Sequence, residues 1–304
     1  SDAAGFDVFG VGEHHRLDMA ISSPAVVMAA IAQATTRIRL TSAVTVLSTL
    51  DPVRVFQDFA TVDLLSNGRA EVTAGRGAFT ESFPLFGYDT KDYDALFAEK
   101  LDLLVKLNRD KRITWEGRFR APLKDAEIAP RPVESLPIWV GVGGNPDSPL
   151  RAADHGLPMV LANITRPPAT FAGQIAAYRQ RHAERGHPAE TRKVSIATHL
   201  HVAKDSQTAI EEFYPYNNAY FSGHVPRRDL PRGVTREVYD ERLSPKGPIF
   251  VGSPQQIIDK LMYERELFGH DRFIAQVDLG GKPYALVARC IELLAEKVLP
   301  ALKQ

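Results

Sequence analysis

The sequence predicts an α/β fold in which a parallel sheet is covered by helices. Strand-like and helix-like segments alternate along most of the 304 residues, and this repetition is typical of a parallel sheet with helices outside it. Seven segments have strand character, namely residues 6–11, 38–50, 70–75, 137–143, 157–162, 194–202 and 273–279. A (β/α)8 TIM barrel needs one strand more.

The opening of the chain favours one of two arrangements of these strands. Ser1-Asp-Ala-Ala-Gly5 has the composition of a helix end. We therefore expect that the first strand and most of the first helix of a (β/α)8 TIM barrel are missing from the N-terminus of this sequence. A complete open sheet of seven strands is the competing arrangement. We expect a single barrel domain over residues 1–304, with insertions at about residues 112–136 and 205–248.

Proline and capping residues mark where the predicted helices begin and end. Ser23-Pro24 and Asp51-Pro52 each combine an N-cap residue with a proline at the first helical position. Asn67-Gly68 ends the helix that Asp51 opens. In the closing helix apolar side chains recur at spacings of four, three and four, at Val287, Ile291, Leu294 and Val298.

The two insertions differ in character. Residues 112–136 hold a hairpin around Glu116-Gly117, followed by a proline-spaced stretch. Within the second insertion, residues 222–248 are rich in proline and glycine and predict a long loop, which is usually a lid or disordered. The arginines in the middle of this stretch suit an acidic substrate group or a solvated loop equally well, and they are Arg227, Arg228, Arg232 and Arg236.

The composition argues against several classes of function. Lys and Arg together number 37, as do Asp and Glu, so no net charge favours nucleic acid or an acidic membrane surface. The only cysteine, Cys290, rules out an intrachain disulfide and fits a reducing compartment. Because no apolar run reaches membrane-spanning length and no signal-peptide pattern is present, we expect a cytoplasmic protein that binds neither nucleic acid nor membranes.

Polar residues follow the first predicted strand at its carboxyl end, where ligands bind in parallel α/β proteins. Gly12-Glu13-His14-His15 comes directly after this strand. Histidine is the side chain most easily tuned to exchange a proton near neutral pH. Taken alone, either histidine is more often a hydrogen-bonded loop residue, so the rest of the chain must decide.

Two further strand ends carry features of an anion site. Arg76 lies between glycines, and its planar guanidinium suits a phosphate, although a solvated loop arginine has the same pattern. The turn Gly143-Gly144-Asn145 precedes a helix, whose first N–H groups favour anions. It is not a dinucleotide fingerprint, because Pro146 stands where the last glycine is needed. A barrel would bring Arg76 and this turn to the same rim.

A metal site and a reactive thiol are less well supported. His199 and His201 alternate along one strand and share a face, and with Asp278 they would suggest a metal-dependent hydrolase. They lie on a late strand with no third histidine ligand in view, so we expect no metal. Cys290 falls among apolar residues in the middle of a helix, which is typical of an inert core position.

The order of several motifs resembles that of the bacterial luciferase-like monooxygenase family. The resemblance covers nearly the whole chain, and its motifs together are specific for the family though not for a substrate. The matching segments are Gly12-Glu-His-His15, residues 38–47, Asp51-Pro-Val-Arg54, residues 64–69, Ala74-Gly-Arg-Gly77, residues 138–144 and Phe250-Val-Gly-Ser-Pro254.

The resemblance implies a β/α barrel that binds reduced FMN, and usually a homodimer packed through the early helices. It implies that His14 works beside the reactive face of the flavin and that Arg76 holds the flavin phosphate. The turn at Gly143, Gly144 and Asn145 would assist Arg76.

The resemblance also places Ala43 and Val44 behind the flavin ring. The family carries a cis peptide without proline at this point, so we expect the Ala43–Val44 peptide to be cis. Light-emitting members have a reactive cysteine where this chain has Gly75, and an acidic residue and serine at the phosphate turn. We therefore expect no light emission.

The resulting hypothesis is a two-component FMN-dependent monooxygenase. A separate flavin reductase would supply reduced FMN, which would use O2 to oxidise a small organic substrate, while the protein binds, orients and excludes water. One alternative is an oxidoreductase of the same fold that transfers hydride with the deazaflavin coenzyme. Another is a flavin-binding protein without catalysis. The sequence does not name the substrate.

Overall fold

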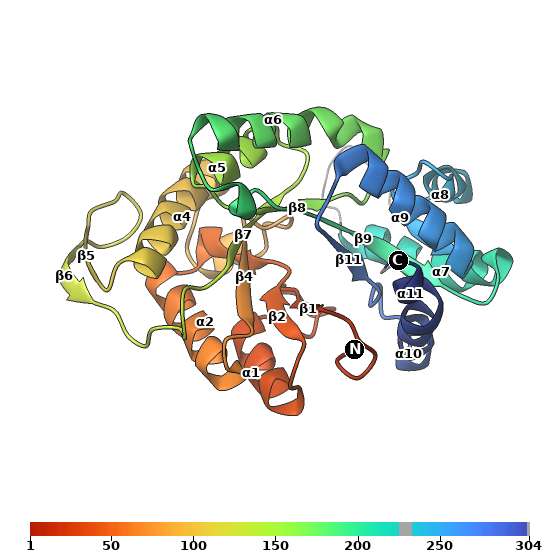
Figure 1. The fold of residues 1–304 in the computed structure, drawn as a ribbon, viewed down its shortest axis with the longest axis horizontal. Helices are drawn as coiled ribbons and strands as arrows, with labels where there is room; N and C mark the ends of the chain where they lie inside the picture. Colours follow the sequence, from red (N-terminus) through yellow and green to blue (C-terminus); the bar gives the residue numbers. More distant parts are fainter. Residues whose placement is uncertain (225–232, 303–304) are drawn as a thin grey trace. The chain divides into compact units, whose positions relative to one another are not determined.

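The computed structural model describes residues 1–224 and 233–302, and it divides into two compact units (Figure 1). The first unit comprises Ser1–Val160 and Arg181–Arg192, and the second comprises Leu161–Gln180 and Lys193–Gln304. The division falls within strand β8 (Met159–Ala162) and helix α6 (Ala172–Glu184). The expectation of a single domain over residues 1–304 stays a prediction.

The first unit is built on parallel strands that pair in the order of the chain. Strand β1 pairs with β2, β2 with β4, and β4 with β7. Within this unit the order of the strands shows no reversal. A barrel requires this, whereas the strand order of an open doubly wound sheet reverses. The bounds of the strands are β1 (Val8–Val11), β2 (Arg39–Ser42), β3 (Thr45–Val46), β4 (Ala70–Gly75) and β7 (Ile138–Val142).

Helices α1 and α2 begin at the predicted prolines, Pro24 and Pro52, although the side chain of Ser23 makes no capping hydrogen bond. Asp51 caps α2, since its carboxylate accepts from the backbone N–H of Val53 at 2.8 Å and of Arg54 at 3.3 Å. Asn67 ends α2 in the left-handed conformation, with φ of 56°. The helices are α1 (Pro24–Ala34), α2 (Pro52–Ser66), α3 (Ser82–Leu85), α4 (Tyr93–Arg109) and α5 (Asp147–Asp154), with short 3-10 turns at Leu47–Thr49, Thr90–Asp92 and Ala189–Thr191.

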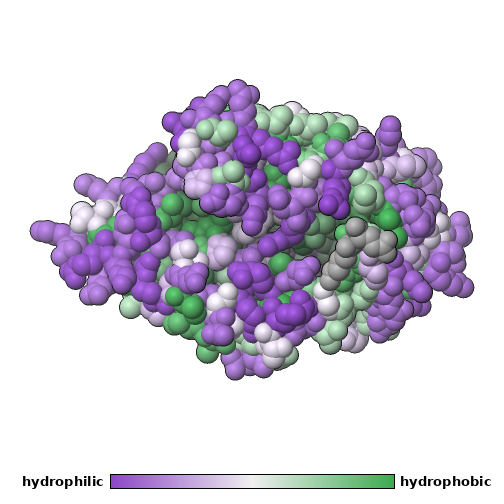
Figure 2. All heavy atoms as spheres, in the orientation of Figure 1, coloured by the Kyte–Doolittle hydropathy of each residue, from purple (hydrophilic) through white to green (hydrophobic). Residues whose placement is uncertain are grey.

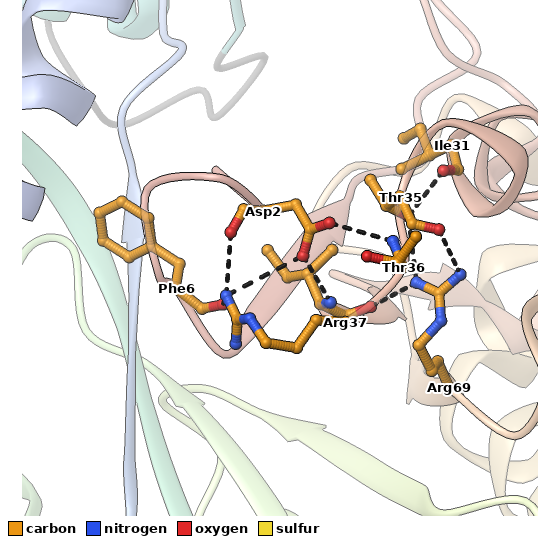
Figure 3. A network of polar contacts seen from close by, with 8 residues as sticks. Asp2, Phe6, Ile31, Thr35, Thr36, Arg37 and Arg69 are labelled. Atoms are coloured by element: carbon orange, nitrogen blue, oxygen red, sulfur yellow. Dashed lines mark hydrogen bonds and ion pairs between the residues drawn. The ribbon is translucent and has the colours of Figure 1, made fainter.

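A network of polar contacts fixes the connection from α1 to β2 (Figure 3). Arg69 donates to the carbonyl oxygens of Ala32 and Thr35, which satisfies acceptors at the end of α1. The carboxylate of Asp2 accepts from the backbone N–H of Thr36 at 3.0 Å and of Ile38 at 2.8 Å. This network lies at the amino end of β2, so the carboxyl ends of the strands are left for chemistry.

The second unit is centred on β9 (Val194–Val202). The early part of β9 pairs with β11 (Arg272–Gln276), and its end pairs with β10 (Phe250–Gly252). The remaining elements of this unit include a 3-10 turn at Pro168–Phe171 and α7 (Ser206–His224), α8 (Arg236–Leu243), α9 (Pro254–Phe268), α10 (Tyr284–Leu293), a π-helical segment at Leu294–Val298 and α11 (Leu299–Leu302).

The structure corrects two of the predicted segments. Residues 38–50 do not form one strand, because β2 ends at Ser42, β3 begins at Thr45 and a 3-10 turn follows. The predicted loop at residues 222–248 contains α8, which begins after Thr235, whose side chain caps it. Strand β10 was not among the seven predicted strands.

The predicted hairpin is present and lies in the first unit. Strands β5 (Arg112–Trp115) and β6 (Leu123–Glu127) pair antiparallel, and the connection between them is longer than the tight turn expected at Glu116-Gly117.

The surface is mostly polar, as Figure 2 shows for one face. Among the described residues, no helix is both long enough and apolar enough to cross a membrane.

In the second unit, Arg236 pairs with Glu211 at 2.9 Å and with Asp240 at 2.9 Å. It is therefore an exposed structural arginine rather than a ligand for a substrate. The other three arginines of the predicted loop, Arg227, Arg228 and Arg232, lie outside the described residues.

Candidate functional site

Every residue that the sequence analysis assigns to the cofactor site lies in the first unit, just beyond the carboxyl end of a parallel strand. His14 follows β1, and Ala43 with Val44 follows β2. Arg76 follows β4, and the turn of residues 143–145 follows β7. Strand β4 pairs directly with β7, from Val72↔Ile138 to Ala74↔Val140. Arg76 and the turn therefore leave the sheet from neighbouring strands.

The Ala43–Val44 peptide bond is cis, as predicted. Ala43 is held in place by its N–H, which donates to the carbonyl of Val11 at 2.8 Å. Ala43 is exposed and Val44 is half-buried, although Ser42 before them and Thr45 after them are buried. This short break between β2 and β3 thus presents its backbone and two small apolar side chains at the end of the sheet.

Glycines on three strands make room for this break. A Cβ atom at Gly75 would lie 2.9 Å from Cβ of Val44, and one at Gly141 would lie 3.1 Å from its Cγ1. A Cβ atom at Gly10 would lie 3.1 Å from Cβ of Ala43. The side chains of Ala43 and Val44 therefore occupy the space that larger residues on β1, β4 and β7 would fill. The glycines can be read from the sequence, but only the fold shows that all three leave space for the side chains of Ala43 and Val44.

His14 lies beside a carboxylate on a neighbouring loop. Its Nδ1 is 3.5 Å from Oε1 of Glu81, and its ring packs against that of Phe79 at 5.4 Å between centroids. Burial lowers the pKa of His14 below its usual value, while Glu81 acts in the opposite direction. The imidazole is thus predominantly neutral near pH 7, and a neutral ring can both give and accept a proton.

His15 is part of a structural contact. Its Nε2 lies 2.9 Å from Oε1 of Glu13, whose other oxygen accepts from the backbone N–H of Val46 at 2.9 Å. Glu13 is 4% exposed, and burial raises the pKa of its carboxyl group. Glu13 therefore ties the loop after β1 to β3. The sequence analysis did not assign a role to Glu13, because its partner lies on another strand.

Arg76 is docked on the first turn of α4. Its Nη1 donates to Oδ1 of Asp94 at 2.5 Å, and its guanidinium lies over the ring of Tyr93, 5.1 Å from the centroid. The hydroxyl of Tyr93 donates to the carbonyl of Gly77 at 2.5 Å. The side chain of Arg76 is only 13% exposed. Arg76 is therefore a positioned cation and not a freely solvated loop arginine.

The turn of residues 143–145 opens α5. The side-chain oxygen of Asn145 accepts from the backbone N–H of Asp147 at 2.8 Å, and its carbonyl accepts from that of Ser148 at 3.4 Å. Gly144 is exposed. The hydroxyl of Ser148 is buried and has no hydrogen-bond partner in the part of the chain that the structure describes. A helix start with an unused hydroxyl beside it suits an anion.

These residues fit the phosphate of a flavin-type cofactor by the chemistry of their donors. Arg76 supplies a cation, and Ser148 at the start of α5 supplies a hydroxyl donor. Ala43 and Val44 supply an apolar surface of backbone and small side chains at neighbouring strand ends. His14 supplies a neutral imidazole.

The other candidates of the sequence analysis lie in the second unit and serve the core. His201 is held between Oε2 of Glu212 at 3.0 Å and Nζ of Lys282 at 3.2 Å. His199 is fully buried against Tyr220, with 5.1 Å between the ring centroids. In residues 1–224 and 233–302 no three His, Cys, Asp or Glu side chains gather as a metal site would need. Cys290 is buried, and burial raises the pKa of its thiol.

Comparison with known sequences gives a consistent result. The family model described as luciferase-like monooxygenase matches residues 1–271. The 4-hydroxyprotoasukamycin monooxygenase of Streptomyces nodosus subsp. asukaensis is 27% identical over 318 residues, which cover 98% of this chain and 83% of that protein. The oxygenase component of the flavin-dependent trigonelline monooxygenase of Acinetobacter baylyi is 23% identical over 334 residues, covering 100% of this chain and 88% of that protein.

Solved structures agree on the fold. A monooxygenase of Streptomyces bottropensis has a TM-score of 0.82 at 22% identity, covering 99% of this chain and 90% of that one. An F420-dependent secondary alcohol dehydrogenase, solved with an F420–acetone adduct, has a TM-score of 0.78 at 19% identity, covering 99% and 92%. These neighbours share the (β/α)8 fold, and the family match extends over most of the chain. The chain therefore belongs to the luciferase-like monooxygenase family of (β/α)8 oxidoreductases.

Proposed function

We propose that this protein is the oxygenase component of a two-component, FMN-dependent monooxygenase. A separate flavin reductase would supply the reduced FMN, and a small organic compound would be the substrate. The observation that carries the proposal is the placement of Arg76 and the start of α5 after two paired strands, β4 and β7. The relatives named as monooxygenases, one of them as the oxygenase component of a flavin-dependent system, support it.

Each residue of the site has a defined part in this proposal. Arg76 and the turn at Gly143, Gly144 and Asn145 would bind the phosphate of FMN. Ala43 and Val44 would support one face of the flavin ring. When bound, the flavin would supply the oxygen chemistry.

His14 would hold or move a proton beside the flavin. Its ring is neutral near pH 7 because burial disfavours the charged form. Glu81, 3.5 Å from Nδ1, fixes the orientation of the ring and limits how far its pKa falls. A neutral imidazole so placed can act in general acid–base catalysis.

Hydride transfer with the deazaflavin coenzyme is the second candidate function. The structural likeness to an F420-dependent alcohol dehydrogenase favours it, although at 19% identity this likeness concerns the fold. The two candidates differ in the cofactor and in the use of O2.

The test has two parts. Fluorescence titration of the purified protein with FMN and with the deazaflavin coenzyme should show tight binding of FMN alone. Oxygen consumption is then measured with a flavin reductase, FMN, NADH and a panel of small organic substrates, with product formation as the readout. Tight binding of the deazaflavin coenzyme in place of FMN would support the second candidate. Binding of FMN without any product from the panel would argue against the monooxygenase assignment.

A further inference from the structure

Arg151 is a half-buried cation on α5 with one buried nitrogen that is not hydrogen-bonded to any described residue. It lies in the second turn of α5, and its guanidinium is over the ring of Phe97 at 5.7 Å. Its Nη1 is buried and has no hydrogen-bond partner among the described residues, and none of the ion pairs found there involves this side chain. Burying a cation without an anion is costly, and such positions usually serve a ligand or a network.

The charges around Arg151 come from three elements. Burial lowers the pKa of Arg151, and the nearby positive charge of Arg76, beyond the end of β4, lowers it further. Asp94 on α4 and Asp147 at the start of α5 act in the opposite direction. Asp94 is already bonded to Arg76 at 2.5 Å. Arg76 and Arg151 thus contact the same helix, α4, one turn apart, at Asp94 and at Phe97, and the carboxylate of Asp94 is bonded to Arg76.

A second observation points to the same place. Ser148 lies three residues before Arg151, so both side chains project from the same face of α5. Ser148 is 2% exposed, and its hydroxyl has no hydrogen-bond partner among the residues that the structure describes. The first turns of α5 thus carry two buried side-chain donor atoms without a hydrogen-bond partner among the described residues, at the end of the helix whose dipole favours an anion.

The charge balance indicates which anion would fit. A phosphate monoester carries about two negative charges at pH 7, because its second pKa is about 6. A phosphate diester carries one charge, and a flavin without phosphate carries none at this position. Two arginines match the doubly charged group.

We propose that Arg151 is the second cation of the cofactor phosphate site and makes the site selective for a doubly charged phosphate monoester. The inference rests on the proposed function, which places the phosphate at Arg76 and the start of α5. It goes beyond that function because it names the residue that selects FMN over the deazaflavin coenzyme. The phosphate of the deazaflavin coenzyme is a diester.

The experiment compares FMN with riboflavin, which has the same ring but no phosphate. Dissociation constants are measured by flavin fluorescence between pH 5 and pH 8 for the wild-type protein, Arg151→Met, Arg151→Lys and Arg109→Met. Methionine keeps the length and apolar contacts of the side chain at position 151 without its charge. Arg109 is the matched control, because it is exposed and its ion pair among the described residues is with the adjacent Asp110.

The proposal predicts a loss confined to FMN. Arg151→Met should weaken FMN binding at pH 8 by about 10- to 100-fold, as expected for a lost charge-assisted contact. Riboflavin binding should stay within about twofold, the scale of a perturbation far from the ring. Arg151→Lys should restore part of the FMN affinity, and Arg109→Met should leave it unchanged.

The pH dependence gives an independent readout. Wild-type affinity for FMN should fall as the pH drops through about 6, because the phosphate takes up its second proton there. The fall should be smaller in Arg151→Met. His155, directly after α5, is also near Arg151, whose positive charge helps to lower the pKa of its imidazole. Protonation of His155 would add a positive charge and strengthen phosphate binding at low pH, so His155 cannot produce the predicted fall.

Several results would overturn the proposal. If Arg151→Met bound FMN as tightly as the wild-type protein does, Arg151 would not recognise the phosphate. The same would follow if the variant lost equal affinity for FMN and for riboflavin. An unchanged pH dependence in Arg151→Met would lead to the same conclusion. If the wild-type protein bound neither FMN nor riboflavin, the proposed function itself would fail, and this outcome is distinguishable because it appears before any variant is made.

Discussion

His14 and His15 are adjacent in the sequence, yet the structure gives them different surroundings. His15 bonds to Glu13, a buried carboxylate that also holds the backbone of β3. His14 has the partly exposed Glu81 as its neighbour, and its own side chain is 26% exposed. The two histidines therefore differ in their polar partners, and this difference makes His15 a structural residue and His14 a candidate catalytic residue.

Replacing His14 should affect turnover more than binding. His14→Ala should lower the turnover number of the reconstituted system by about 100-fold, the lower end of what a general acid or base contributes. The dissociation constant of FMN should change by no more than about twofold, because the phosphate contacts remain. Product formation and flavin fluorescence measure the two quantities.

His15→Ala is the informative comparison for His14→Ala. It should reduce the free energy of unfolding by about 1–3 kcal/mol, because Glu13 loses a buried partner. Unchanged turnover in His14→Ala would remove His14 from the catalytic role.

In the proposed site, Asp94 would compete with the cofactor phosphate for Arg76. It is 60% exposed and bonds to the guanidinium at 2.5 Å. Asp94→Asn should therefore strengthen FMN binding by about two- to fivefold, as expected for an exposed ion pair. Flavin fluorescence titration at low ionic strength measures the effect. Weaker binding in this variant would mean that Asp94 positions Arg76 instead of competing for it.

At the scale of elements, the break between β2 and β3 depends on glycine in its neighbours. A Cβ atom at Gly75 on β4 would lie 2.9 Å from Cβ of Val44, closer than side chains pack. Gly75→Ala should lower the free energy of unfolding by about 1–3 kcal/mol, the usual effect of overpacking. Denaturant unfolding of the protein without cofactor measures it.

Gly12→Ala provides the matched control for Gly75→Ala. A Cβ atom at Gly12 would make an ordinary contact, 3.6 Å from the carbonyl oxygen of Ala43. Its stability should stay within about 0.5 kcal/mol of the wild type, as for substitutions that meet no obstacle. Equal losses in both variants would show that space beside Val44 is not what Gly75 provides.

Strand β9 carries a titratable group that affects stability at acid pH. Burial lowers the pKa of His199 to about 3. In the unfolded chain its pKa is about 6.5. Because the folded-state value is the lower one, the contribution is complete above pH 6.5 and is lost as the pH falls toward 3.

Removing this group should flatten the acid branch of the stability profile. The free energy of unfolding of His199→Phe should fall less steeply than that of the wild type between pH 6.5 and about 4. Phe221→Leu, which alters a ring 6.0 Å from His199, should keep the wild-type slope. Identical slopes in His199→Phe and the wild type would show that His199 is not protonated on unfolding.

At the scale of the whole molecule, the alternation of strands and helices could be predicted from the sequence because it depends on local signals. Asp51 and Asn67 bound α2 as predicted, and the strand at residues 70–75 was predicted at its observed bounds. The break within residues 38–50 could not be predicted from local signals, since the segment is rich in β-branched residues and contains no glycine or proline. The family resemblance supplied the Ala43–Val44 cis peptide instead.

The site was only partly predictable for a related reason. The strand ends indicated Arg76 and the turn at residues 143–145, because parallel strands direct their following loops to one rim. The partners of these residues were not indicated. Asp94 lies eighteen residues from Arg76 in the sequence, and Val46 lies thirty-three residues from Glu13. Only the fold shows that they meet, and the same holds for Arg151 and Phe97.

The central claim is that Arg76 and the start of α5 bind the phosphate of FMN. The most direct test is the dissociation constant of FMN for the wild-type protein and for Arg76→Ala, measured by fluorescence titration with Arg109→Ala as the control. We predict a loss of about 1.5–3 kcal/mol in binding free energy for Arg76→Ala, the usual contribution of a hydrogen bond to a charged group, and no loss for the control. An unchanged dissociation constant in Arg76→Ala would contradict the claim.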